Sequence, residues 1–216
     1  KKFNKKPIVK GFTTNPSLLK KSNIKNYKDF VFKCKKIIKS KSISFEVTAD
    51  KCEKILKQAK WLLKNAKNSF IKVPILNSQG NYNIKIIKKL QSIGCKLNIT
   101  AVFTEKHVDI ILKNINTKVP TIISIFSGRI ADTGKDPNKV VKFAIKRKKN
   151  NKKTKILWAS AREVYNFYEA KKIGCDIITL DKSIISKFKL KNKNLHKYSQ
   201  ETSLQFFKDG KKIKFI

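Results

Sequence analysis

The stretch Phe70-Ile71-Lys72-Val73-Pro74 is apolar except for one lysine. A near-continuous apolar run of this length is typical of a strand that is buried on both faces, as in a parallel sheet covered by helices. Lys72 does not suit such a strand, because burying an unpaired ammonium group is so costly that the amine tends to lose its proton. A neutral amine at the end of a strand is a nucleophile for carbonyl groups. The alternative is that, in a lysine-rich chain, a lysine falls in a strand by chance. The rest of the sequence has to distinguish a reactive amine from such a chance placement.

Similar apolar stretches recur along the chain, and longer amphipathic helical patterns with lysine on one face separate them. The predicted strands lie at residues 8–13, 42–47, 70–74, 96–102, 121–126, 155–159 and 176–180. The predicted helices lie at residues 26–39, 50–65, 84–93, 105–114, 137–149, 163–173, 182–188 and 195–208. We expect Thr104 and Ser183 to begin helices, and Gly94 and Gly174 to end them.

Strict alternation of strands and helices predicts parallel strands joined by crossover helices. No G-x-G-x-x-G pattern follows the first strand, which disfavours a dinucleotide-binding sheet. We therefore expect an α/β fold, a (β/α)8 TIM barrel, with residues 1–216 as a single domain that includes the C-terminal helix at about 195–208. Seven strands are visible where the barrel needs eight, and the chain contains no methionine. We interpret both observations as an N-terminal truncation that removed the first strand and all but the tail of its helix, near residues 1–5.

The formal net charge of +38 at pH 7 raises nucleic acid as a partner. However, the charge is spread along the whole chain, and the only arginines are Arg129, Arg147 and Arg162. Base readout and phosphate clamping favour the planar guanidinium group, so we expect no specific nucleic-acid partner. No apolar run is long enough for a membrane span, and the N-terminal residues do not resemble a signal peptide. We therefore expect a cytoplasmic protein with no membrane partner.

The cysteines and histidines give no sign of a metal site. The four cysteines, at positions 34, 52, 95 and 175, fit no close-set metal motif, and only His107 and His196 could assist them. We expect the cysteines to be reduced and buried as small apolar residues. The two histidines lie in predicted helices, and we expect them at the surface instead of in a catalytic site.

Polar residues recur near the C-terminal halves of the predicted strands. Glu46, Lys72, Asn98 and Ser124 follow one another at intervals of 26 residues, Asn15 follows the first visible strand, and Ser160 follows the sixth. In a barrel these positions converge on one mouth, where active sites of this fold are built. Buried polar groups need partners, and packing alone does not favour such a ring. The ring therefore favours a Schiff-base site at Lys72.

Two interpretations stay open for the neighbours of Lys72. Glu46 is either a proton-transfer group, acting directly or through a water molecule, or the ion-pair partner of Lys72. Asn98 and Thr100 face the same side of their strand. They either serve the site or form hydrogen bonds between strands.

Two of the three arginines also follow predicted strands at this mouth. Arg129 follows Ser127-Gly128, and Arg162 follows Ser160-Ala161. Guanidinium groups bind phosphate in a bidentate manner, and the late strands of a barrel often furnish a phosphate site. The alternative is that these arginines form salt bridges to Asp132 or Glu163.

Five motifs, in order along almost the whole chain, resemble the transaldolase and fructose-6-phosphate aldolase superfamily. They are Gly11-Phe12-Thr13-Thr14-Asn15-Pro16-Ser17-Leu18, Ile71-Lys72-Val73-Pro74, Leu97-Asn98-Ile99-Thr100, Ile123-Ser124-Ile125-Phe126-Ser127-Gly128-Arg129-Ile130 and Ala159-Ser160-Ala161-Arg162. The resemblance implies a class I aldolase mechanism on a (β/α)8 barrel, with no metal and no organic cofactor.

The resemblance also implies a role for each candidate residue. Lys72 matches the lysine that attacks the ketose carbonyl, Glu46 matches a carboxylate that works through a catalytic water, and Thr100 helps to hold that water. The residues implied to bind the substrate's hydroxyl groups or to line its pocket are Asn15, Asn98, Ser124 and Phe126. The residues implied to bind the substrate's phosphate are Arg129, Ser160 and Arg162.

Glu46 and Phe126 favour one activity within the superfamily, because the simple aldolases tend to have Gln and Tyr at these positions. The favoured activity is transaldolase, which moves a dihydroxyacetone unit between sugar phosphates in the non-oxidative pentose phosphate pathway. The alternatives are a fructose-6-phosphate aldolase-like lyase and an inactive barrel that binds sugar phosphates or polyanions. We expect phosphorylated sugars as partners and a homo-oligomer.

The resemblance departs from the family's pattern upstream of the first visible strand. The family's own first strand carries an aspartate that acts as acid and base at the substrate's C4 hydroxyl, and the sequence as written shows no such strand. We therefore expect Lys72 to capture substrate and carbon–carbon cleavage to be impaired in this chain alone.

Overall fold

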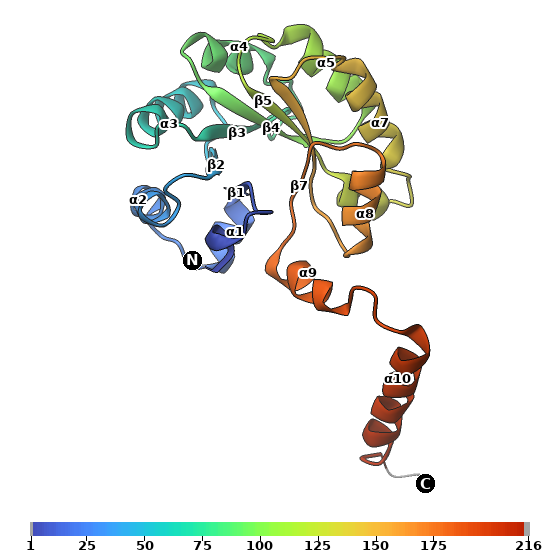
Figure 1. Ribbon diagram of the computed structural model, residues 1–216. Coiled ribbons are helices and arrows are strands. Elements are labelled where there is room, and N and C mark those ends of the chain that lie inside the picture. The colour runs from blue at the N-terminus through green and yellow to red at the C-terminus, as the bar shows by residue number, and fades with distance from the viewer. Residues whose placement is uncertain (1, 214–216) are drawn as a thin grey trace. The chain divides into compact units, whose positions relative to one another are not determined.

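Seven parallel strands form one curled sheet in the computed structural model, which describes residues 2–213 (Figure 1). The strands are β1 (Gly11–Thr13), β2 (Ser42–Glu46), β3 (Phe70–Pro74), β4 (Lys96–Val102), β5 (Thr121–Ile125), β6 (Thr154–Trp158) and β7 (Ile177–Ile178). They pair in chain order from β1 to β7. The expected fold class is confirmed, since seven parallel strands in a curled half-barrel with flanking helices match a (β/α)8 barrel that lacks one strand.

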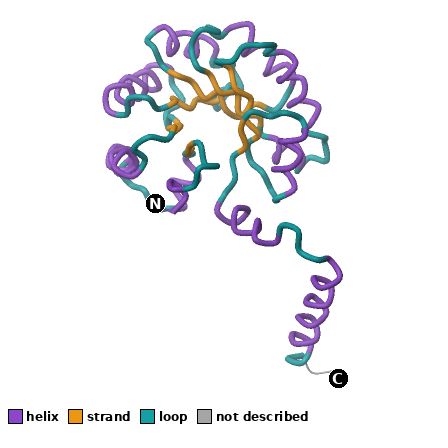
Figure 2. The backbone as a smooth tube through the Cα atoms, in the orientation of Figure 1, coloured by secondary structure: helices purple, strands orange, loops and turns teal. Residues whose placement is uncertain are grey.

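Helices follow the strands and flank the outside of the curl (Figure 2). Those up to Leu180 are α1 (Pro16–Lys21), α2 (Tyr27–Ile37), α3 (Cys52–Asn65), α4 (Ile84–Ser92), α5 (Glu105–Asn114), α6 (Ser127–Ala131), α7 (Asn138–Arg147) and α8 (Tyr165–Lys172), after a 3-10 turn η1 (Lys2–Lys5). Asp181 begins a separate compact unit with α9 (Lys182–Lys187), a 3-10 turn η2 (Phe188–Leu190) and α10 (Leu195–Gly210). That residues 1–216 form one domain stays a prediction.

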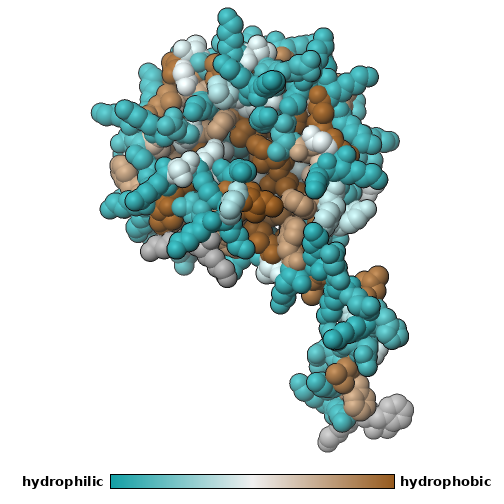
Figure 3. All heavy atoms as spheres, viewed as in Figure 1, coloured by the Kyte–Doolittle hydropathy of each residue, from teal (hydrophilic) through white to brown (hydrophobic). Residues whose placement is uncertain are grey.

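The barrel unit has apolar layers on both faces of its strands. Residues such as Ile71, Val73 and Ile123 alternate toward the helices and are fully buried. On the opposite strand face, Ile122, Leu157 and Ala159 form a cluster against which Phe70, Phe126 and Ile177 pack. Figure 3 shows apolar side chains in the middle of this unit, surrounded by a hydrophilic surface. Lys72 therefore lies in a strand with apolar neighbours on both sides, as its sequence context predicted.

The structure shortens both end strands of the sheet. Residues 8–10 were expected in the first strand, but β1 begins at Gly11, and Ile8 is 72% exposed. The last strand was expected at 176–180, but β7 contains two residues, which pair with Leu157 and Trp158. A strand at the edge of a sheet has one neighbour, so fewer hydrogen bonds hold its ends. Two short helices, α1 and α6, were not predicted.

The helix-boundary predictions are confirmed except one. Thr104 caps α5 by accepting a hydrogen bond from His107 N. Gly94 and Gly174 follow α4 and α8 with φ of 84° and 75°, a backbone conformation that glycine adopts without strain. Ser183 is not the start of α9, because Asp181 caps this helix through a hydrogen bond from Ile184 N.

The prediction of buried cysteines is wrong for three of the four. Cys95 is buried, Cys34 and Cys175 are half-buried, Cys52 is exposed, and all four are free thiols. Burial raises the pKa of the Cys95 and Cys175 thiols to about 11.

Within residues 2–213, no group of three or more His, Cys, Asp or Glu side chains could hold a metal ion. In the same part of the chain, no helix is both long enough and apolar enough to cross a membrane.

Candidate active site

Lys72 and Glu46 form a buried ion pair at the centre of the candidate site. They are direct neighbours in the register of β2 and β3, which places both side chains on the same face of the sheet. Lys72 Nζ lies 2.8 Å from Glu46 Oε2, with 8% and 11% of the two side chains exposed. Oε2 has no aligned hydrogen bond within residues 2–213, so the contact is electrostatic. The ion-pair interpretation of Glu46 therefore describes the observed geometry.

Thr14 connects this pair to the end of β1. Its carbonyl oxygen accepts a hydrogen bond of 3.1 Å from Lys72 Nζ. Its hydroxyl donates to Ser44 O at 3.3 Å and accepts from Glu46 N at 3.1 Å. Thr14 is part of the first motif, but no role was predicted for it, since nothing in a sequence shows which backbone carbonyl a lysine will reach.

Asn98 continues the row of polar side chains into β4. It pairs in register with Lys72, so Glu46, Lys72 and Asn98 lie side by side on three neighbouring strands. Asn98 Nδ2 donates to Ser44 Oγ at 3.0 Å, and Asn98 Oδ1 accepts from Ser124 Oγ at 2.7 Å. This buried chain of hydrogen bonds fixes the orientation of the Asn98 amide. Ser44 was not among the predicted residues.

Ser124 lies two residues further along β5 than Ile122, the residue that pairs with Asn98. Asn98 pairs with Ile122, not with Ser124, and the register of β4 and β5 shifts between Ile99 and Val102. Ala101 has φ of 56°, in the left-handed region that non-glycine residues rarely occupy. The 26-residue interval therefore corresponds to direct pairing between neighbouring strands for Glu46, Lys72 and Asn98, but not for Ser124.

Thr100 lies on β4 opposite Pro74 and is buried. Its hydroxyl oxygen has no hydrogen-bond partner within the described residues. A buried hydroxyl usually has a partner, so such a group marks a place where a ligand or water molecule completes the structure. The role of Thr100 in holding a water molecule stays a prediction.

Asn15 and Phe126 also contribute to local structure. Asn15 caps α1, since its Oδ1 accepts a hydrogen bond of 2.7 Å from Leu18 N. Phe126 packs against the inner apolar cluster, contacts Phe103 with 5.6 Å between ring centroids, and has the Arg129 guanidinium 5.3 Å above its ring. The capping bond uses one of the two lone pairs of the Asn15 oxygen.

Close backbone contact joins the two segments of the predicted phosphate site. Gly128 N donates to Ala159 O at 3.3 Å, and a Cβ atom at position 128 would lie 1.6 Å from Ser160 O. Glycine is therefore the residue that permits this approach. Ser160 itself has φ of 64°.

The arginines of this region differ in their partners. Arg129 is exposed and stacks on Phe126. The guanidinium of Arg162 donates two hydrogen bonds to the Asp132 carboxylate. Nε donates to Oδ1 at 3.0 Å, and Nη2 donates to Oδ2. This hydrogen-bonded contact lowers the pKa of Asp132. The salt-bridge interpretation of Arg162 therefore describes the observed contact, and Asp132 is its partner.

Tyr27 is a residue near the site that the sequence did not reveal. Its hydroxyl donates to the Glu46 carbonyl oxygen at 2.8 Å, from the first turn of α2. Burial, and then the nearby Glu46 charge, raise the pKa of Tyr27 above its ordinary value. A tyrosine at the start of a predicted helix gives no signal of this contact.

The predicted positions of the histidines agree with the structure in part: His196 is exposed, whereas His107 is half-buried and accepts a hydrogen bond from Phe103 N.

Comparisons with known proteins point to one enzyme family. A family model described as Transaldolase/Fructose-6-phosphate aldolase matches residues 1–215. A probable transaldolase of Nitrosopumilus maritimus (strain SCM1) is 33% identical over 216 residues, which cover 99% of this chain and 90% of the relative. A probable transaldolase of Caldicellulosiruptor saccharolyticus is 30% identical over 208 residues, which cover 95% of this chain and 89% of the relative.

Another relative has a similar degree of identity. A probable transaldolase of Methanococcus vannielii is 30% identical over 188 residues, which cover 87% of this chain and 83% of the relative. Among solved structures, a flavocytochrome b2 mutant has a TM-score of 0.40 and 13% identity over 78% of this chain and 55% of its own, a likeness too weak to support an argument. The family model and the relatives show that this chain belongs to the transaldolase/fructose-6-phosphate aldolase family.

Proposed function

We propose that this protein transfers a dihydroxyacetone unit between sugar phosphates through a Schiff base on Lys72, as a transaldolase of the non-oxidative pentose phosphate pathway. The observation that carries the proposal is the Lys72 amine, which is buried in a strand and lies 2.8 Å from a carboxylate. Membership of an aldolase-type enzyme family supports it.

The proposed reaction begins when Lys72 Nζ, without its extra proton, attacks C2 of a ketose phosphate. The carbinolamine then loses water, and a protonated imine forms between Nζ and C2. Once a base has taken the proton of the C4 hydroxyl, a role that the family gives to an aspartate on a strand before β1, the C3–C4 bond breaks, its electron pair moves toward the imine nitrogen, and an aldose phosphate leaves. The three-carbon enamine that stays on Lys72 attacks the aldehyde of an acceptor aldose phosphate, and hydrolysis of the new imine releases the product ketose.

Glu46 is placed to serve the proton transfers at Nζ. Its carboxylate is the acidic group in contact with Lys72, so it can take the proton that the ammonium must lose before attack. Loss of water from the carbinolamine needs a proton at the departing hydroxyl, and the same carboxylic acid can return it. The Thr100 hydroxyl, buried and without a partner in the described residues, can hold a water molecule for this step.

The amides and arginines would hold the rest of the substrate. Asn98, fixed by Ser44 and Ser124, offers its amide group beside Lys72. Arg129, Ser160 and Arg162 would bind the substrate's phosphate. The guanidinium of Arg162 now binds Asp132, so a phosphate with a greater charge has to share it or take the place of Asp132.

A fructose-6-phosphate aldolase-like lyase is the alternative, and the family description includes that activity. Both enzymes form the same imine on Lys72. They differ in the fate of the enamine, because the lyase protonates it and releases dihydroxyacetone, whereas the transaldolase needs an aldose phosphate acceptor. Turnover of fructose 6-phosphate with and without erythrose 4-phosphate separates the two.

Borohydride trapping tests the proposal directly. The protein is incubated with fructose 6-phosphate, reduced with borohydride and digested with trypsin. A reduced adduct on Lys72 prevents cleavage after this residue, so the adduct should appear on a peptide of residues 68–85, which otherwise is cleaved in two. The Lys72→Met variant should give no adduct there. Trapping on other lysines at equal yield, with none on Lys72, would overturn the proposal.

A further inference from the structure

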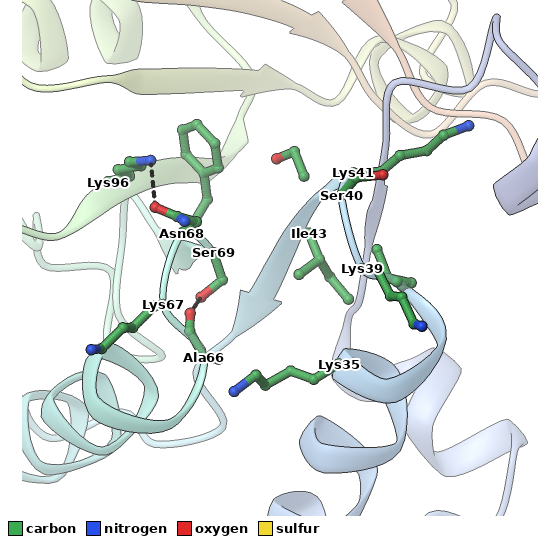
Figure 4. A pocket seen from close by; sticks show the side chains of 13 residues that line it. Lys35, Lys39, Ser40, Lys41, Ile43, Ala66, Lys67, Asn68, Ser69 and Lys96 are labelled. Atoms are coloured by element: carbon green, nitrogen blue, oxygen red, sulfur yellow. Dashed lines mark hydrogen bonds between the residues drawn. The ribbon is translucent and has the colours of Figure 1, made fainter.

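A lysine-lined cavity lies away from the Lys72 site, at the opposite ends of the strands. It has a volume of about 430 Å³ and is formed by the end of α2, the beginning of β2, the segment before β3 and the first residue of β4 (Figure 4). Ligand pockets in proteins commonly have volumes of about 300–1,000 Å³. The cavity is therefore large enough for a small molecule.

The charged lining of this cavity is basic only. Five of its lining residues are lysines and none is acidic: Lys35, Lys39, Lys41, Lys67 and Lys96. None of them takes part in an ion pair among the described residues. Lys41 Nζ donates to the Lys6 carbonyl at 2.6 Å, and Lys96 Nζ contacts Asn68 Oδ1 at 3.5 Å. Carboxylates elsewhere in the barrel unit bind lysines, as at Asp109 and Asp176. The positive charge around the cavity is therefore not neutralised by the protein.

The lining also contains hydroxyl groups and apolar side chains. Ser40, Ser42 and Ser69 line the cavity together with the half-buried Ile38 and Phe70. Lys35 extends from α2 across the cavity toward the segment that holds Ala66 and Lys67 (Figure 4). An anion in the cavity would thus meet ammonium groups from separate segments of the fold.

We propose that this cavity binds a small molecule that carries a polyphosphate chain. Lysine binds phosphate as a point charge, and several ammonium groups around one cavity favour a ligand with several negative charges over a monophosphate. The chain could be inorganic or part of a nucleotide, in which case the apolar wall of Ile38 and Phe70 would contact the organic part. The proposal does not rest on the proposed function, since none of its residues belongs to the Lys72 site.

Lysine footprinting locates the ligand in this lysine-rich protein. The full chain is acetylated with sulfo-NHS acetate, with or without tripolyphosphate or ATP, in about 0.15 M salt, and each lysine's acetylation is read by peptide mass spectrometry. We expect protection of Lys35, Lys39 and Lys67, and none of the exposed Lys142 and Lys171 outside the cavity. Equal protection by both ligands indicates an inorganic chain, and stronger protection by ATP indicates a nucleotide. Uniform protection, or stronger protection by single-stranded DNA, would overturn the proposal.

Charge-matched variants test the site by calorimetry with tripolyphosphate. The Lys35→Gln/Lys67→Gln variant should bind about tenfold or more weakly, because each hydrogen bond to a charged group contributes substantially. The Lys142→Gln/Lys171→Gln variant loses the same net charge and should change affinity by less than about twofold, since screening limits distant charges. The Arg162→Gln variant should bind normally. Equal weakening in both double variants, or loss of binding in Arg162→Gln, would show a non-specific or different site.

Discussion

Lys72 and Glu46 are paired directly across β3 and β2, with their charged groups 2.8 Å apart in the interior of the barrel unit. Removal of one partner leaves the other charge buried without compensation, which typically costs about 3–5 kcal/mol. We therefore expect both Glu46→Gln and Lys72→Met to lower the free energy of urea unfolding by about that amount. Removing both charges can be almost neutral.

The double variant Glu46→Gln/Lys72→Met separates stability from function. We expect it to recover most of the lost stability, as measured by urea denaturation, and to form no borohydride-trapped adduct. Glu46→Gln alone should retain the amine and form the imine about 100-fold or more slowly, because a positioned proton-transfer group typically contributes that much. A double variant as unstable as the sum of the two single ones would mean that the pair is not coupled.

The Ser124 hydroxyl donates a 2.7 Å hydrogen bond to the buried Asn98 amide. Ser124→Ala should lower the free energy of unfolding by about 1–3 kcal/mol, because it leaves a buried acceptor without this donor. It should also raise the KM for the sugar-phosphate substrate, because the Asn98 amide loses one of the hydrogen bonds that fix its orientation. Ser92 is an exposed serine with a local bond to Lys89 O, so Ser92→Ala should change stability by less than about 0.5 kcal/mol. A smaller effect at Ser124 than at Ser92 would contradict the proposed network.

Much of the barrel could be predicted because its strands are encoded locally. The strands predicted at 70–74 and 96–102 coincide with β3 and β4. Mainly apolar segments between helical patterns are typical of strands in the middle of a parallel sheet. The bulge at Ala101 could not be predicted, because it depends on the pairing of β4 with β5. The contacts of Glu46 with Lys72 and of Arg162 with Asp132 also required the structure, since sequence spacing does not reveal which opposite charge a flexible side chain reaches.

The close approach of Gly128 to Ser160 makes a glycine substitution informative. In Gly128→Ala, the new Cβ would lie 1.6 Å from Ser160 O, so the backbone of one segment must move. We expect a loss of about 3 kcal/mol or more in unfolding free energy, which is the upper range for overpacking, and weaker binding of sugar phosphates. At Gly210 nothing lies within 4 Å of the corresponding position, and Gly210→Ala should be almost neutral in the same urea denaturation assay. Equal effects at the two positions would contradict the backbone contact.

Asp176 should make stability depend on pH. Burial raises its pKa, but hydrogen bonds from Lys148 and from Ile156 N outweigh this, so the pKa is lowered in the folded protein. A lowered pKa contributes stability above the unfolded value of about 4, and this contribution is lost as pH falls through the folded value. Urea denaturation should therefore show Asp176→Asn to be less stable than the natural chain at pH 6, with a difference that shrinks toward pH 2.5. A difference that stays constant with pH would contradict this assignment.

Arg162 tests whether the end of the barrel near β6 recognises phosphate. The guanidinium is about half exposed and is held by Asp132, so it is oriented before a substrate arrives. Removing a charged hydrogen-bond donor to phosphate typically costs about 1.5–3 kcal/mol, so Arg162→Gln should raise KM for fructose 6-phosphate about 10- to 100-fold. Dihydroxyacetone has no phosphate, and its imine with Lys72 should be trapped at the same rate in the variant and the natural chain. If trapping of both ketoses fell equally, Arg162 would act on the structure around Lys72 and not on the phosphate. If neither measurement changed, the salt bridge with Asp132 would be its whole role.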